Sequence, residues 1–152
     1  MSRRTRLALF LYGVAATAFA VDRITKWIVH RHLAGRPPID VIPGVVRLRY
    51  TTNTGGAFGL FGGQAWLFFL ATVIVCLVIV VASTRLDSKA TAIGLGLILG
   101  GALGNLTDRL IRGRGGVIDF IDFRVWPVFN AADSAIVVGA IVVAVAGMFH
   151  RE

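Results

Sequence analysis

Few of the residue patterns that carry chemistry in enzymes are present in this sequence. The single cysteine, Cys76, lies inside an apolar run, which excludes a disulfide framework and favours a packing role. The three histidines, His30, His32 and His150, do not form a zinc-binding pattern. The motifs His-Glu-x-x-His and Gly-x-Ser-x-Gly are absent, as is a glycine-rich phosphate loop ending in Lys-Ser or Lys-Thr. By elimination, any catalysis must depend on aspartates.

Acidic residues are also scarce. Eight Asp and Glu face sixteen Lys and Arg, which gives a net charge of +8. Such a charge can indicate a nucleic-acid partner, but the basic residues gather at the ends of apolar runs, so phospholipid headgroups are the expected partners. With 56% hydrophobic residues and a mean hydropathy of +0.76, the chain is too apolar for a soluble domain of 152 residues. We therefore expect one integral-membrane domain over residues 1–152.

Four apolar runs are long enough to cross a bilayer as helices. The first follows a basic start and could be a cleavable signal peptide, but its helical pattern continues through Trp27, a typical interfacial anchor. We interpret it as a retained helix. In the third run, glycines at four-residue intervals predict close helix packing. The predicted spans cover about residues 7–29, 65–82, 90–106 and 135–149.

Two longer polar segments, 33–63 and 107–133, would share one side of the membrane, and both termini would share the other. Turn residues and an alternating run at 46–50 predict a small extramembrane β-sheet in the first segment. Its glycine-rich stretch, 53–59, is interpreted as a turn. The fold class is thus a mainly α membrane protein with four transmembrane helices and a small extramembrane sheet.

Charge does not decide which side faces the cytoplasm. Lys and Arg number six on the terminal side and ten on the other, so the positive-inside rule would place the polar segments in the cytoplasm. When acidic residues are subtracted, each side has a net charge of +4. The orientation therefore needs another argument.

The stretch from Gly116 to Ser134 carries isolated carboxylates where the chain meets the membrane. Asp119 shares one face of an alternating strand with Val117 and Ile121, and Asp133 lies at the start of the last apolar run. Carboxylates beside hydrocarbon are costly and point to function. Because a strand, a turn and a helix start can fold back on themselves, we predict that Asp119 and Asp133 form an acid/base pair that hydrolyses a peptide bond.

A simple capping role for Asp133 is the main alternative, because Asn130, Asp133 and Ser134 precede an apolar run as helix caps do. No such role is open to Asp119 inside a strand. Asp122 is predicted to lie on the opposite strand face, either solvated or paired with Arg124.

Two further polar groups have alternative structural roles. Asp22 and Lys26 are four residues apart on one helix face, which suits either a structural ion pair or a site. Asn105, Asp108 and Arg109 share one face at the end of the third span. We interpret them as an Asp–Arg pair, held by Asn105, that supports the following loop.

The order of five motifs resembles that of bacterial lipoprotein signal peptidase, also called signal peptidase II. The resemblance spans nearly the whole chain, and five ordered motifs are specific where any single one would be weak. The motifs are Asp22-x-x-Thr-Lys26, Asn53-x-Gly-x-Ala-Phe58, Gly101-Ala-Leu-Gly-Asn-Leu-Thr-Asp-Arg109, Val117-Ile-Asp-Phe120 and Phe129-Asn-x-Ala-Asp133.

The resemblance implies an aspartyl endopeptidase of the bacterial cytoplasmic membrane, with both termini cytoplasmic and the active site at the outer face. Such an enzyme removes the signal peptide from diacylglyceryl-modified prolipoproteins by cutting just before the lipidated cysteine. It implies no metal or organic cofactor, sensitivity to the antibiotic globomycin, and a substrate cradle formed by the extramembrane sheet. We expect a monomer in contact with membrane lipid. The implied catalytic residues are Asp119 and Asp133; the implied supporting residues are Asp22, Lys26, Asn53, Gly101, Asn105, Asp108, Arg109 and Asn130.

Two departures from the family pattern affect loops. The segment Arg112–Gly116 lengthens the connection between Arg109 and Asp119, and Gly56 stands where alanine is frequent.

Two other kinds of protein could use these residues: a small transporter or proton channel that relays protons through the same aspartates, and a structural membrane subunit. A conduction path needs polar residues at mid-span. Spans 65–82 and 135–149 contain no charged residue, so a cleft at one membrane face is favoured.

Overall fold

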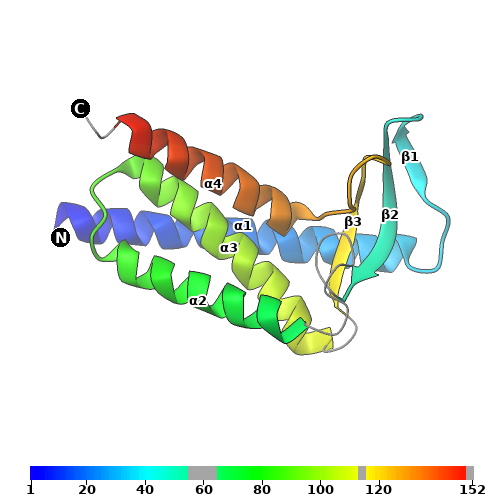
Figure 1. Cartoon of the computed structure of the whole chain (residues 1–152), viewed down its shortest axis with the longest axis horizontal. Helices are drawn as coiled ribbons and strands as arrows, with labels where there is room; N and C mark the ends of the chain where they lie inside the picture. Colours follow the sequence, from blue (N-terminus) through cyan, green and yellow to red (C-terminus); the bar gives the residue numbers. More distant parts are fainter. Residues whose placement is uncertain (55–64, 113–115, 150–152) are drawn as a thin grey trace.

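Four long helices and a three-stranded sheet make up the described chain. The computed structural model describes residues 1–54, 65–112 and 116–149 (Figure 1). All four helices are long and apolar enough to cross a membrane, so the predicted four-helix membrane architecture is confirmed. The elements are α1 (Arg3–Leu33), β1 (Ile39–Ile42), β2 (Val46–Asn53), α2 (Ala65–Ser83), α3 (Lys89–Arg112), β3 (Val117–Asp122) and α4 (Ala131–Phe149).

Helix α3 lies at the centre of the bundle and contacts each of the other three helices (Figure 1). Its glycines allow this close approach. A Cβ atom on Gly100 would collide with the backbone of Ala15 in α1, and one on Gly101 would collide with the carbonyl of Ala132 in α4. The predicted close packing at these small residues is confirmed, and it brings the middle of α3 against the middle of α1 and the start of α4.

The sheet lies at one end of the bundle, beyond the start of α4 (Figure 1). Its strands are antiparallel in the order β1-β2-β3, and Thr51 of β2 pairs with Asp119 of β3. Apolar side chains of β3, including Ile118 and Phe120, pack on the last turns of α1 at Val29 and Leu33. The sheet predicted in residues 33–63 is therefore present, and the aspartate segment supplies its third strand.

Three helices, α1, α3 and α4, are longer than the apolar runs suggested. Helix α1 covers Arg3–Leu33, against a predicted span of 7–29. Helix α3 continues to Arg112, and α4 begins at Ala131. Asp108 and Asp133 therefore lie on helical turns, where their direction is fixed by helix geometry. The glycine-rich stretch after Thr54, including Gly56, and residues 113–115 lie outside the described residues.

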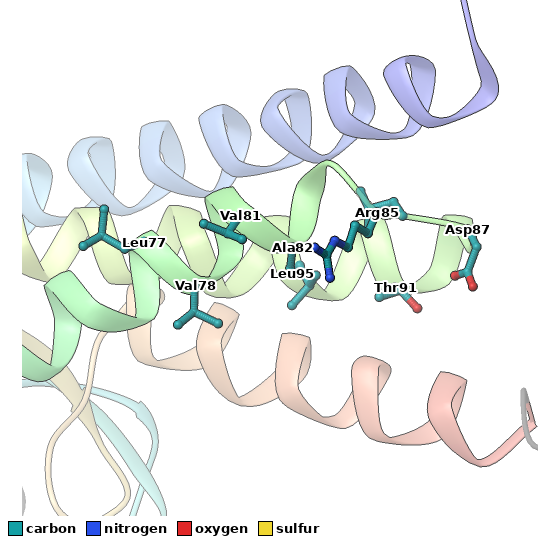
Figure 2. A pocket seen from close by; sticks show the side chains of 9 residues that line it. Leu77, Val78, Val81, Ala82, Arg85, Asp87, Thr91 and Leu95 are labelled. Atoms are coloured by element: carbon teal, nitrogen blue, oxygen red, sulfur yellow. The ribbon is translucent and has the colours of Figure 1, made fainter.

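A wide groove opens at the other end of the bundle, between α2 and α3. Figure 2 shows Leu77, Val78, Val81 and Leu95 on its walls, with Arg85 among the residues that line it. Its volume is about 630 Å³, larger than that of the cleft beside the sheet. The groove is mainly a lipid-facing surface, because its α2 residues Leu77, Val78 and Val81 are each more than 60% exposed.

Candidate active site

Asp119 and Asp133, which the sequence analysis predicts to meet, line one cleft where β3 approaches the first turn of α4. The cleft has a volume of about 300 Å³. Its other walls come from β2, from the ends of α2 and α3, and from the segment that joins β3 to α4. The lining residues are Asn53, Phe68, Asn105, Arg109, Val117, Asp119, Trp126, Pro127, Val128, Phe129 and Asp133.

Asp119 is held almost completely out of solvent, with 3% of its surface exposed. Asn130 Nδ2 donates a 2.7 Å hydrogen bond to Asp119 Oδ1, and the side chain of Asn53 forms another hydrogen bond to this carboxyl group. The preceding residue is fixed on both sides. The Ile118 N–H donates to Asp108 Oδ2 at 3.2 Å, and the Ile118 carbonyl accepts from Asn130 Nδ2 at 3.1 Å. The direction of Asp119 therefore follows from contacts with α3 and with the residue before α4.

Asp133 lies in the first turn of α4, and Asn130 is the residue that caps this helix. The Asp133 N–H donates to Asn130 Oδ1 at 2.9 Å, while the Asn130 N–H donates to Asp133 Oδ2 at 3.1 Å. This reciprocal arrangement satisfies two backbone donors and matches a capping box. Asn130 and Asp133 therefore share the capping function that was considered for Asp133 alone, and Asn130 is the residue at the cap position. The second oxygen of Asp133, Oδ1, accepts from Asn105 Nδ2 at 2.8 Å.

Two asparagines connect the aspartates. Asn130 Nδ2 is 3.1 Å from Asn105 Oδ1 and also donates to Asp119. Asn105, as described, donates to Asp133. The two carboxyl groups therefore occupy one hydrogen-bonded network, in which a change of charge on one acid is felt by the other.

A cluster of buried ion pairs contacts this network through Asn105. Lys26 Nζ lies 2.9 Å from Asp22 Oδ2, 3.0 Å from Asp108 Oδ2 and 2.9 Å from Asn105 Oδ1. Lys26, Asp22 and Asp108 are each 0% exposed, and Arg23 forms a further ion pair with Asp108. Buried charges are tolerated when they are paired, and each charge of this cluster has an opposite charge within 3.0 Å. The predicted Asp22–Lys26 pair is confirmed.

Asp22 also places the start of α4. Its Oδ1 accepts a 3.0 Å hydrogen bond from the Ala132 N–H, in the first turn of that helix. A carboxylate is favoured there because helix N-termini carry unpaired N–H groups and a partial positive charge. Contacts among α1, α3 and α4 thus fix the position of Asp133.

Arg109 does not pair with Asp108, which contradicts the predicted Asp–Arg brace. Asp108 forms ion pairs with Lys26 and Arg23. Arg109 lines the cleft, and its charge is attracted first to Asp133, then to Asp119 and least to Asp108. Adjacent helical residues point about 100° apart, so the two side chains reach different partners. The Arg109 guanidinium also lies 6.0 Å from the ring centroid of Phe68.

The pKa of Asp119 is raised from 3.8 to about 7. Burial is the largest cause, because it disfavours the charged form, and the nearby charge of Asp133 adds to it. Hydrogen bonds from Asn130 and Asn53 and the charge of Lys26 act in the opposite direction and are outweighed. At neutral pH a large fraction of Asp119 therefore carries a proton beside a second carboxyl group.

Asp122 contradicts its predicted role. It is buried, not solvated, and its side chain pairs with Arg47 and Arg49, while the Arg124 side chain pairs with Asp40. Arg124 contributes to Asp122 only through its backbone N–H, at 2.7 Å. Burial alone would raise the pKa of Asp122, but the Arg47 and Arg124 hydrogen bonds and the two guanidinium charges lower it.

The sequence analysis did not single out several residues of this site. Phe68 and the segment Trp126–Val128 line the cleft, and Arg23 completes the ion cluster. Phe68 is one of many apolar residues in α2, so composition cannot distinguish it. Arg23 follows Asp22 directly and could have been considered as a second cation for the acids nearby. Within the described residues, no group of three His, Cys, Asp or Glu side chains could hold a metal ion.

Comparison with known proteins shows the family of this chain. A family model described as signal peptidase (SPase) II matches residues 14–149. The chain belongs to the signal peptidase II family. The lipoprotein signal peptidase of Desulfitobacterium hafniense is 45% identical over 134 residues, covering 86% of this chain and 87% of that protein. That of Pelotomaculum thermopropionicum is 43% identical over 138 residues and covers 90% of each chain.

The fold is also shared with a solved structure. A bacterial membrane enzyme determined by the in meso method at 2.3 Å resolution superposes with a TM-score of 0.77 at 28% identity, covering 89% of this chain and 85% of that one. The family resemblance noted in the sequence is therefore confirmed. This signal peptidase II chain is a multi-pass membrane protein and an aspartic peptidase by family, and that family cleaves signal peptides from lipoproteins.

Proposed function

We propose that this chain removes the signal peptide from diacylglyceryl-modified prolipoproteins by cutting just before the lipidated cysteine, with Asp119 and Asp133 as its catalytic residues. The observation that carries the proposal is the shared cleft. It holds two carboxyl groups within one hydrogen-bonded network, and the pKa of one of them is raised to about 7. Peptide hydrolysis by aspartates needs one acid and one base, and such a pair supplies both.

In the proposed reaction, Asp133 is the base and Asp119 is the acid. The Asp133 carboxylate takes a proton from water, and the water oxygen attacks the scissile carbonyl carbon. Asp119 gives its proton to the carbonyl oxygen, so that a neutral tetrahedral intermediate forms. The C–N bond then breaks as Asp133 returns its proton to the leaving nitrogen and Asp119 recovers a proton from the diol. No proton is gained or lost over the cycle apart from those of the water consumed.

The supporting residues hold the two acids in place. Asn105 donates a 2.8 Å hydrogen bond to Asp133, and Asn130 donates a 2.7 Å hydrogen bond to Asp119. Arg109 contributes a positive charge near both acids, which stabilises negative charge in the cleft. Lys26 and Asp22 position Asn105 and the start of α4. Gly101 allows α3 and α4 to approach closely.

The membrane placement in this proposal has two sources: the open sheet for the depth of the cleft, and the family resemblance for the orientation. An open sheet cannot lie in hydrocarbon, because its edge N–H and C=O groups would have no partners. We place residues 1–152 as one peptidase domain, with both termini in the cytoplasm and the cleft at the outer membrane face. The sheet then forms a cradle for the lipidated precursor. A monomer, surrounded by membrane lipid and inhibited by globomycin, is part of the same proposal.

A proton channel is less well supported. Among the described residues, α2 has no charged side chain and α4 has only Asp133, in its first turn. The charged groups of the bundle core, Asp22, Lys26 and Asp108, are fully buried and paired with one another, so they do not form a water-filled path.

The direct test is cleavage of a diacylglyceryl-modified precursor by detergent-purified protein. Asp119→Asn and Asp133→Asn should each abolish turnover, while Asp40→Asn, an exposed carboxylate on the sheet, should not change it. In the wild type, kcat/KM should fall as the pH rises through about 7, because Asp119 loses the proton that it donates. Near-normal turnover by either cleft variant would refute the assignment, and globomycin provides a parallel inhibition control.

A further inference from the structure

Two arginines of β2 share a single buried carboxylate. Arg47 Nε lies 2.7 Å from Asp122 Oδ2, and Arg49 Nε lies 2.9 Å from the same oxygen. The other oxygen of Asp122 accepts the Arg124 N–H at 2.7 Å. Both oxygens of this carboxylate therefore have partners, and two guanidinium charges face one negative charge.

The outer ends of these two arginines remain available. The Arg47 and Arg49 side chains are 31% and 40% exposed. Arg47 Nε donates a hydrogen bond to Asp122, whereas Arg49 Nε is buried and contacts Asp122 as an ion pair without a hydrogen bond. Both contacts with Asp122 use Nε. No acceptor for the terminal Nη groups of either arginine is found among the described residues. Arg47 and Arg49 are two residues apart on one strand and contact the same oxygen of Asp122. Their terminal N–H groups are therefore neighbouring donors that face solvent.

Arg124, on the same sheet, shows that the excess of positive charge is confined to Arg47 and Arg49. Its guanidinium pairs with Asp40 at 2.8 Å, one cation with one anion, on the same sheet. The charge of Arg124 is therefore matched, while that of the Arg47 and Arg49 pair is not.

The position of the pair determines what it can meet. In Figure 1 the end of the sheet at which β1 turns into β2 lies to the side of the start of α4 and not directly beyond the helices. With the membrane placement given above, this end would lie over lipid. Arg47 is the second residue of β2, close to that turn. Apolar side chains of the same hairpin, Ile39, Val41 and Val45, are more than half exposed, which is typical of a surface in contact with lipid.

We propose that Arg47 and Arg49 together bind the phosphate group of a membrane phospholipid, with Asp122 as their buried anchor. The inference rests on the membrane placement given above but not on the peptidase reaction. Guanidinium groups bind phosphate oxygens with charge-assisted, often bidentate hydrogen bonds, and an Nη pair already fixed through Nε loses little freedom on binding. Such a contact would hold the sheet at the level of the headgroups and set the height of the cleft above the hydrocarbon.

The test measures lipid retention by purified protein in mixed micelles, with native mass spectrometry as the readout. The probes are phosphatidylglycerol, diacylglycerol with the same chains but no phosphate, and inorganic phosphate. Wild-type protein should retain phosphatidylglycerol in clear preference to diacylglycerol. Arg49→Gln should weaken that retention about five-fold, the contribution expected of one basic residue near an anionic lipid surface. Asp122 keeps its 2.7 Å contact with Arg47 in this variant.

The matched control is Arg124→Gln, which removes the same charge from the same sheet and should change retention less than about two-fold, because that charge is already neutralised by Asp40. An equal loss in both variants would show diffuse charge attraction and overturn the site. Equal retention of the two lipids by wild-type protein would overturn it without any variant. If the protein bound inorganic phosphate but did not retain phosphatidylglycerol, the ligand would be free phosphate, and the proposal of a lipid ligand would be overturned. Since no precursor is present, a failure of the cleavage assay leaves this result unaffected.

Discussion

Replacing the acid in β3 should make the protein inactive and, above neutral pH, more stable. In the folded chain the pKa of Asp119 is about 7, against an ordinary value of 3.8. A difference of about three units corresponds to about 4 kcal/mol between the two protonation states. The side-chain amide of the Asp119→Asn variant resembles the protonated acid and never has to ionise.

The sign of the effect follows from proton binding. Below pH 3.8 the carboxyl group is protonated in the folded and unfolded chains alike, so the variant gains nothing. As the pH rises from about 4 to about 7, the unfolded chain ionises while the folded chain keeps its proton. The free energy of unfolding of the wild type therefore falls over this interval and is constant above it. The gain of Asp119→Asn should reach up to about 4 kcal/mol at about pH 8.5.

The measurement is unfolding in mixed micelles with increasing sodium dodecyl sulfate, followed by tryptophan fluorescence at about pH 5 and about pH 8.5. Other titrating groups cancel when the variant is compared with the wild type at each pH. Asp40→Asn is the matched control, because the Asp40 side chain is half exposed and should shift the free energy of unfolding by less than about 1 kcal/mol at either pH. A variant that is no more stable than wild type at the higher pH, or equally stabilised at both values, would refute the reasoning.

Two further changes test the scaffold of the site. Lys26→Met leaves Asp22 buried without its cation and should lower the free energy of unfolding by about 3–5 kcal/mol in the same assay. The Asp22→Asn/Lys26→Met double variant should recover much of this loss. Additive losses of the two single variants would argue against the pair. Gly101→Ala places a methyl group against the Ala132 carbonyl and should separate α3 from α4 at Asn105. Cleavage of the precursor should therefore fall at least about ten-fold. Gly13→Ala, whose new methyl group meets no neighbouring atom, should leave cleavage unchanged. Equal activity of the two glycine variants would show that this close approach does not position the cleft.

Local patterns in the sequence carry much of this architecture. The helices follow from apolar length, and the Asp22–Lys26 contact follows from helical spacing, because both depend on residues near one another in the chain. The encounter of Asp119 with Asp133 was also predictable, since a short turn limits how far a strand can lie from the helix that follows it. These features need no knowledge of distant partners.

Other features depend on contacts between distant segments and could not be read from one sequence. Asp122 pairs with Arg47 and Arg49 because of the β2–β3 register, which is shifted between Leu48 and Thr51. Asp108 and Arg109 have different partners because Arg23 and Lys26 of α1, distant in the sequence, bind Asp108. Helix α3 itself continues past the apolar run, where hydropathy falls but backbone hydrogen bonds persist. Hydropathy measures transfer to lipid, not helix formation, so it ends the predicted span too early.

The full burial of Lys26, Asp22 and Asp108 has a consequence for how the enzyme responds to its surroundings. Dissolved ions weaken attraction between charges that they can approach, and they cannot enter a cluster with no exposed surface. Changes in the ionic strength of the surrounding solution should therefore leave the arrangement of the two acids intact. The partly exposed arginines of the sheet have no such protection, so salt should act on how the protein meets the bilayer while its chemistry stays the same.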